Sequence, residues 1–174
     1  TVSLNPETLE DAETHHEEQN GAVRATRGWS RGLHYFEFRV EGDSDGHGYP
    51  SVGVVTLDAP LHTGGECVIG GEHGRGWGYY LAELNMVHAG EMESLQGADE
   101  RVGLWAGDMV TTYFGILLDM SAGTLDLYLD GTLREGARHT DLPRDVPLYA
   151  ACEAGTLENA RVIFDFAARA PRSV

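Results

Sequence analysis

The stretch "GILLDMSAGTLDLYLDG" (115–131) contains two apolar runs joined by a turn of small residues. In the second run, Leu125, Leu127 and Leu129 alternate with more polar residues. Such alternation is typical of a strand with one buried face, so the stretch predicts a hairpin whose leucines point into a core. The pair Asp130-Gly131 predicts a tight turn that leads into the next strand.

Strand patterns continue on both sides of this hairpin. In "HYFEFRV", Phe36, Phe38 and Val40 share one face. The run "SVGVVTL" (51–57) is apolar and β-branched, and it suits a strand that is covered on both faces. Other strands are expected at 77–81, 102–105, 109–118, "VPLYAAC" (146–152) and "ARVIFDF" (160–166), the last with Val162, Phe164 and Phe166 inward. Many short strands, with turns between them and no long helix, predict one all-β sandwich.

The composition excludes several classes of function. The chain has 174 residues and a net charge of −16, with 28 acidic residues against 12 basic ones. Because this charge repels phosphates, we expect no nucleic acid partner and no membrane. Every basic residue is Arg and there is no Lys, which excludes a Walker A loop and a Schiff-base lysine. Codon bias, a strongly hydrated surface and escape from self-ubiquitination all stay open as explanations for the missing lysine.

The composition also suggests the boundaries of the domain. Residues 1–20 are expected to form an acidic arm, either extended or with a short helix that begins at Asn5-Pro6. Residues 21–170 are expected to form the sandwich, and 171–174 a tail. The chain begins at Thr1 without a leader, so we interpret it as a fragment that lacks targeting information.

No motif in the sequence indicates catalysis or a cofactor. Cys67 and Cys152 lack metal-ligand spacing, and we expect two free buried thiols in a reducing, cytoplasmic compartment. The glycine-rich "GGEHGRGWG" (70–78) is not followed by a helix that would hold a phosphate. No nucleophile-elbow motif is present. We therefore expect no enzyme activity, no cofactor and no metal.

Several motifs together resemble one family. "GLHYFEF", "SVGVVTLDAPLHTGG", "GWGYYLAELNMVHAG", the hairpin stretch and "PLYAAC" occur in the order and spacing of a SPRY domain, from about Ala22 to Phe166. "VGVVTLDAPLH" followed by "GWGY" is similar to the SPRY domains of SOCS-box and F-box proteins, which are substrate receptors of ubiquitin ligases. The resemblance implies a twisted antiparallel β-sandwich of the concanavalin-like jelly-roll type, with no catalytic centre. It also implies loops at one end that hold a short peptide.

The resemblance also implies where the peptide pocket lies. In the SOCS-box members the pocket for an acidic, Asn-rich peptide uses Arg, Pro, Thr, Tyr, Leu and a Val-Trp-Gly segment. The matching positions in this chain are Glu13, His15, Gly48, Glu66 and Ile69, followed by Ala154, Gly155 and Thr156. Because Glu13 and Glu66 replace Arg and Tyr, an acidic peptide meets like charge here. We expect a basic or neutral peptide instead.

Two aromatic residues are further candidates for the interface. Trp29 and Tyr49 are expected at exposed loop tips, where aromatic side chains anchor interfaces. Trp77 and Trp105, by contrast, are expected in or beside the core.

These features together predict a monomeric, non-catalytic module that binds a protein or peptide. Two alternatives stay open. One is a lectin-like sandwich that binds a glycan, with calcium at Asp43 and Asp45. Against calcium, the twelfth position of an EF-hand loop begun at Asp43 is Val54 rather than Glu, which favours a polar hairpin loop. The other alternative is a structural domain of a larger assembly.

Overall fold

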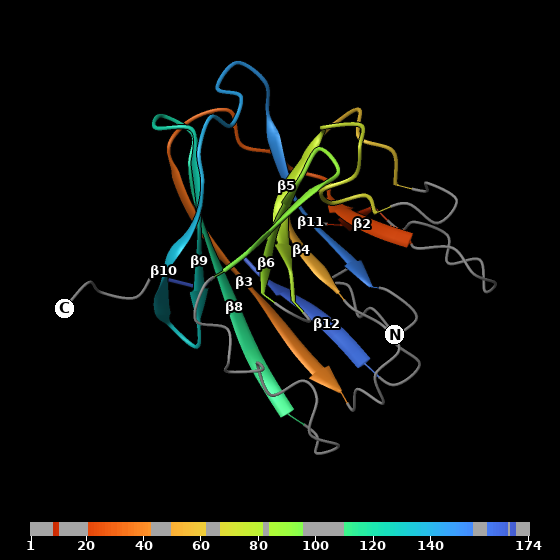
Figure 1. The fold of residues 1–174 in the computed structure, drawn as a ribbon, viewed down its shortest axis with the longest axis vertical. Coiled ribbons are helices and arrows are strands. Elements are labelled where there is room, and N and C mark those ends of the chain that lie inside the picture. The colour runs from red at the N-terminus through yellow and green to blue at the C-terminus, as the bar shows by residue number, and fades with distance from the viewer. Residues whose placement is uncertain are drawn as a thin grey trace.

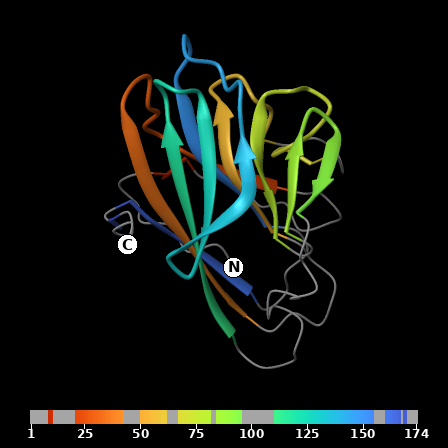
Figure 2. The same cartoon turned by 60° about the vertical axis from the view of Figure 1, so that its left-hand side comes forward.

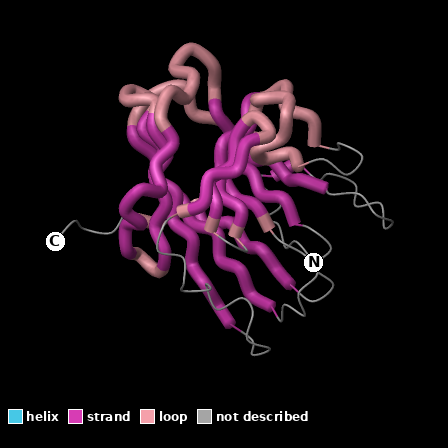
Figure 3. The backbone as a smooth tube through the Cα atoms, in the orientation of Figure 1, coloured by secondary structure: helices cyan, strands magenta, loops and turns pink. Residues whose placement is uncertain are grey.

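The chain folds into two antiparallel sheets that pack face to face (Figures 1 and 3). The computed structural model describes residues 9–10, 21–42, 50–61, 67–81, 84–95, 110–154, 160–166 and 168–169. The strands are β1 (Leu9–Glu10), β2 (Gly21–Ala25), β3 (Leu33–Gly42), β4 (Ser51–Thr56), β5 (Gly76–Tyr80), β6 (Asn85–His88), β7 (Glu91–Ser94), β8 (Val110–Asp119), β9 (Thr124–Leu129), β10 (Thr132–His139), β11 (Leu148–Ala154) and β12 (Ala160–Asp165). These residues include no helix, and hence none that could cross a membrane. The predicted all-β sandwich is confirmed.

The order of the strands differs from their order in the sequence. Sheet A has the order β1-β2-β11-β4-β5-β6-β7, and sheet B has the order β10-β9-β8-β3-β12. Strands β3 and β8 pair over ten residues, from Leu33↔Asp119 to Gly42↔Val110. Figure 2 shows β8 extending beyond its neighbour β9. The expected strand at 102–105 lies outside the described residues.

The core lies between the two sheets, where the alternating apolar positions meet. Phe36 and Phe38 of β3 and Leu125 and Leu127 of β9 are fully buried, as the alternation predicts. Val162 is 1% exposed, while Phe164 and Phe166 pack against the core from a half-buried position. The predicted β4 is buried at each residue from Ser51 to Val55, so it is covered on both faces.

The hairpin from β9 to β10 has the geometry that its sequence predicts. Asp130 and Gly131 both have positive φ, at 46° and 77°, and Leu129 pairs with Thr132 across the turn. Two successive positive φ values are the mark of a type I′ turn, which matches the twist of the flanking strands. Asp126 on the outer face of β9 is nevertheless buried, because Arg138 of β10 covers it with hydrogen bonds of 2.6 and 3.0 Å.

The strands of sheet A define two ends of the sandwich. Strands β5 and β11 finish, and β4 and β6 begin, at the same end, since Ser51 pairs with both Tyr80 and Glu153. We call this the loop end; in Figure 1 the arrowhead of β11 points toward it. At the opposite end, the backbone of Trp29 pairs with that of Leu148.

Candidate functional site

A short segment lies directly on the outer face of sheet A. This segment, residues 67–71, is called the strap here, and it leads from the loop end into β5. A Cβ atom on Gly78 of β5 would collide with Ile69 of the strap and with the carbonyl oxygen of Val52. A Cβ on Gly76 would lie 3.2 Å from Ile69 Cα. The glycines of "GRGWG" thus allow the strap to pack against the sheet backbone.

Apolar contacts hold the strap in place. A second core cluster lies under it, separate from the core between the sheets. Its buried members are Val55, Ala59, Ile69, Val87 and Ala151, with Tyr80 and Tyr149 packed at its edge. The amide of Gly90 also donates a 2.7 Å hydrogen bond to the carbonyl of Gly70. The strap is therefore part of the packed structure of sheet A.

A buried carboxylate holds the strap at the loop end. Glu153 of β11 is only 2% exposed, and its Oε2 accepts hydrogen bonds from the amides of Val68, at 3.0 Å, and Ile69, at 3.4 Å. Its other oxygen, Oε1, is buried and has no hydrogen-bond partner among the described residues. Half of this carboxylate therefore lacks a described partner, although buried polar groups are nearly always hydrogen-bonded.

The surroundings of Glu153 disfavour its charge. Burial raises the pKa of Glu153 to about 7, against the lowering effect of the two strap amides. No cationic side chain is among the causes of the change. At neutral pH the carboxyl group is therefore divided between its neutral and charged forms.

The exposed thiol close to this carboxylate is a poor nucleophile. Cys67 lies at the exposed start of the strap, and burial together with the charge of Glu153 raises its pKa. A reactive cysteine needs a lowered pKa, so this pair does not have the character of a catalytic dyad. The expectation that both thiols are free is confirmed, but only Cys152 is buried. Within the described residues, no three His, Cys, Asp or Glu side chains form a metal site.

Polar residues extend from Glu153 across the outer face. The register places Glu153 beside Ser51, Ser51 beside Tyr80, and Tyr80 beside Asn85. Ser51 and Asn85 are 2% and 4% exposed, and Tyr80 is half-buried. We call these four residues the polar row. It crosses four strands at the loop end and combines a carboxyl, a hydroxyl, a phenol and an amide.

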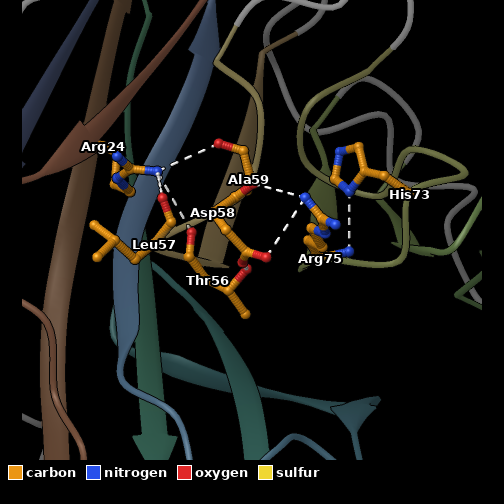
Figure 4. A network of polar contacts seen from close by, with 7 residues as sticks. All are labelled: Arg24, Thr56, Leu57, Asp58, Ala59, His73 and Arg75. Carbon is orange, nitrogen blue, oxygen red and sulfur yellow. Dashed lines mark hydrogen bonds and ion pairs between the residues drawn. The ribbon is translucent and has the colours of Figure 1, made fainter.

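At the opposite end, two arginines hold the loop that follows β4 (Figure 4). Nη1 of Arg24 donates to the carbonyls of Leu57, at 2.6 Å, and Ala59, at 3.3 Å. Arg75 donates a 2.8 Å bond to the carbonyl of Asp58 and lies 3.5 Å from its carboxylate. These cations stabilise the scaffold through this loop.

Comparison with known proteins gives the family of this sandwich. The family model described as "SPRY domain" matches residues 33–167, which is more than half of the chain. The chain belongs to the SPRY domain family. This confirms the resemblance drawn from its sequence motifs.

Curated relatives of this SPRY domain include two SOCS-box proteins. It is 31% identical over 110 residues to SPRY domain-containing SOCS box protein 1 of Homo sapiens. This alignment covers 63% of this chain and 40% of that protein. It is 30% identical over 111 residues to SPRY domain-containing SOCS box protein 2 of Mus musculus, with coverage of 63% and 41%. The chain thus spans about 40% of the length of these relatives.

Solved structures share the fold. The TRIM65 PSpry domain superposes with a TM-score of 0.60 at 23% identity, over 85% of this chain and 70% of that one. Stonustoxin superposes with a TM-score of 0.59 at 18% identity, over 94% of this chain and 25% of that one. At these identities the two structures support the fold alone.

Most of the predicted pocket positions of this SPRY domain lie outside the described residues. These positions are Glu13, His15, Gly48, Tyr49, Glu66, Gly155 and Thr156; the candidate calcium ligands Asp43 and Asp45 and the predicted core residue Trp105 also lie there. Ile69 is described and is only 1% exposed, because it fills the space above Gly78. Ala154 is the last residue of β11, directly after Glu153.

The expectation that Trp29 is exposed at a loop tip is wrong. Its ring is half-buried and stacks on Phe36, with centroids 5.1 Å apart, and on His34, at 4.9 Å. It also lies at the opposite end of sheet A from Ser51. Trp77, by contrast, is 8% exposed and belongs to the core, as expected.

The sequence reasoning missed Glu153 as a site residue. The signal was present in "LYAACEA", where period two places Glu153 on the same face as Ala151 and Tyr149. A glutamate on the same face as a buried alanine, near the end of a strand, is a candidate for a buried charge.

Proposed function

We propose that this SPRY domain is a non-catalytic interaction module that binds a short peptide segment of a partner protein at its loop end. The main support for the proposal is that the polar row, whose four residues lie on four strands, adjoins the strap at this end. Polar side chains set on rigid strands, beside loops, are suited to recognition.

We further propose that the peptide is basic or neutral. The chain carries a net charge of −16, and acidic residues stand at two of the predicted pocket positions, Glu13 and Glu66. Among the described residues, the carboxyl of Glu153 is an acidic group at the loop end. An acidic peptide would therefore lose affinity through repulsion, whereas a basic peptide would gain association rate.

A peptide array of varied charge at modest salt tests this function. The array holds sequence-matched sets in which only the number of Arg and Asp residues changes. We expect binding to basic and neutral members; a preference for acidic members contradicts the proposal. The paired variant Glu13→Arg and Glu66→Arg should shift the preference toward acidic peptides if the loop end is the working surface. Binding unchanged by this double reversal assigns the activity to another face.

In the complete protein, the module would deliver its partner to a ubiquitin ligase. This proposal follows from the similarity to the two SOCS-box proteins. Pull-down of the full-length protein should recover ligase subunits together with the partner, and recovery of the partner should depend on the loop end. We also expect the isolated domain to be monomeric, which light scattering would check. We expect the full-length protein to be cytoplasmic, which imaging of a tagged version would check.

A further inference from the structure

Glu153 is a buried acid whose hydrogen bonds are incomplete within the described structure. Buried Glu side chains are rare unless they are paired with a cation or fully hydrogen-bonded. Here the two strap amides satisfy Oε2, while Oε1 is buried with no partner among the described residues. A carboxylate is not needed merely to hold the strap, because a neutral hydrogen-bond acceptor would serve the two amides equally well.

The described part of the chain does not supply a cation to this carboxylate. The sequence has no lysine, and the described arginine pairs are formed elsewhere, with Asp58 and Asp126. Arg24 points its guanidinium to the carbonyls after β4, at the opposite end of the sheet. Any cation that pairs with Glu153 therefore comes from outside the described residues.

The chemistry around Oε1 suits a cationic side chain. Ser51 stands beside Glu153 on β4, and Tyr80 stands beside Ser51 on β5, so a hydroxyl oxygen and a phenol oxygen belong to the same face of sheet A as the carboxylate. These oxygens can accept the further N–H groups of a guanidinium or ammonium ion. A pair formed in this buried position is screened less by salt than a pair at the surface.

We propose that Glu153 receives an arginine or lysine side chain of the bound peptide, with Oε1 as the acceptor and Ser51 and Tyr80 beside it. The inference rests on the proposed peptide-binding function and names the residue that sets its charge preference. It differs from the roles predicted for Glu13 and Glu66, because Glu153 belongs to a strand of the scaffold.

The test uses a peptide pair that differs in one charge. An arginine-containing binder from the array is compared with the same peptide carrying citrulline, a neutral analogue of nearly the same shape. Calorimetry measures both peptides against the original domain, Glu153→Gln and Glu135→Gln. Glu135 is exposed on β10 of the other sheet, so its variant controls for the loss of one negative charge.

We expect the original domain and Glu135→Gln to prefer arginine over citrulline at least tenfold, since truncation of a buried charge pair is costly. Glu153→Gln should bind the two peptides within about twofold of each other while keeping its circular dichroism spectrum. Equal preference in the original domain and Glu153→Gln overturns the inference but leaves the proposed function intact. Failure of every array peptide to bind contradicts the proposed function itself.

A pH series gives a second readout that a purely structural role would not affect. Pairing requires the charged carboxylate, so affinity for the arginine peptide should rise several-fold from pH 6 to pH 8. The described titratable groups coupled to Glu153 are Cys67 on the strap and Cys152 beside it in β11. Burial raises both thiol pKa values, so neither thiol ionises in this range. The rise should be absent in Glu153→Gln; the same rise in that variant contradicts the proposal.

Discussion

Replacement of Glu153 by Gln should remove a pH-dependent loss of stability from the free domain. Gln has nearly the same shape and keeps a carbonyl oxygen for the amides of Val68 and Ile69. It cannot carry the charge that burial disfavours. The substitution therefore separates the latch function of the side chain from the cost of its ionisation.

The magnitude follows from the change in pKa. Folding raises the pKa of Glu153 from its ordinary value of 4.5 to about 7. The folded chain therefore holds this proton more tightly than the unfolded chain, and stability falls as pH rises from 4.5 through 7. The full difference corresponds to about 3 kcal/mol. Below pH 4.5 the carboxyl group is protonated in both states, and the cost vanishes.

Urea denaturation followed by tryptophan fluorescence at pH 5, 6, 7 and 8 measures this difference. The free energy of unfolding of Glu153→Gln, minus that of the original domain, should increase by about 2–3 kcal/mol between pH 5 and pH 8. His139 acts in the opposite direction, because burial lowers its pKa and stability then rises with pH up to about 6.5. Since both proteins contain His139, its contribution cancels. A difference that stays constant within about 0.5 kcal/mol across the range refutes the reasoning.

Three further predictions concern the scaffold, each checked by denaturant unfolding. Leu127→Ala should destabilise the domain by about 2–5 kcal/mol, because its fully buried side chain leaves a cavity between the sheets. Gly131→Ala should cost about 1–2 kcal/mol, since the φ of 77° is unfavourable for a residue with a Cβ, and Thr132→Ala is the neutral control. Arg24→Met should destabilise the domain by about 1–3 kcal/mol, because it leaves the carbonyl of Leu57 without its donor. The amide of Ala59, in the same loop, should then exchange faster with solvent. Unchanged exchange contradicts the role of Arg24 in holding this loop.

The residues that follow a strict local period were predictable from the sequence. Leu125 and Leu127 lie in the core, as the alternation of apolar residues along β9 predicts. The turn at Asp130-Gly131 was predictable because few residue pairs tolerate two positive φ values. In these cases the residues that determine the structure lie within a few positions of each other in the sequence.

Features that depend on contacts between distant segments were not predictable in this way. Trp29 belongs to a loop by its sequence, yet Leu148 and Phe36 hold it half-buried. Asp126 has the pattern of an exposed residue, but Arg138 of the next strand covers it. Glu153 is buried because the strap, more than eighty residues earlier in the chain, lies over it. The alternation of residues along one strand does not show which distant residues will contact that strand.

The position of β11 in the middle of sheet A has a consequence for synthesis of the chain. Strand β11 joins β2 to β4, although Leu148–Ala154 is made more than ninety residues after β4. Until it emerges from the ribosome, sheet A remains two separate parts with unpaired edges, and the Glu153 latch is absent. Such edges are prone to pair with other chains, and sheets built from distant strands fold slowly. The surface proposed for recognition is thus completed among the last steps of folding.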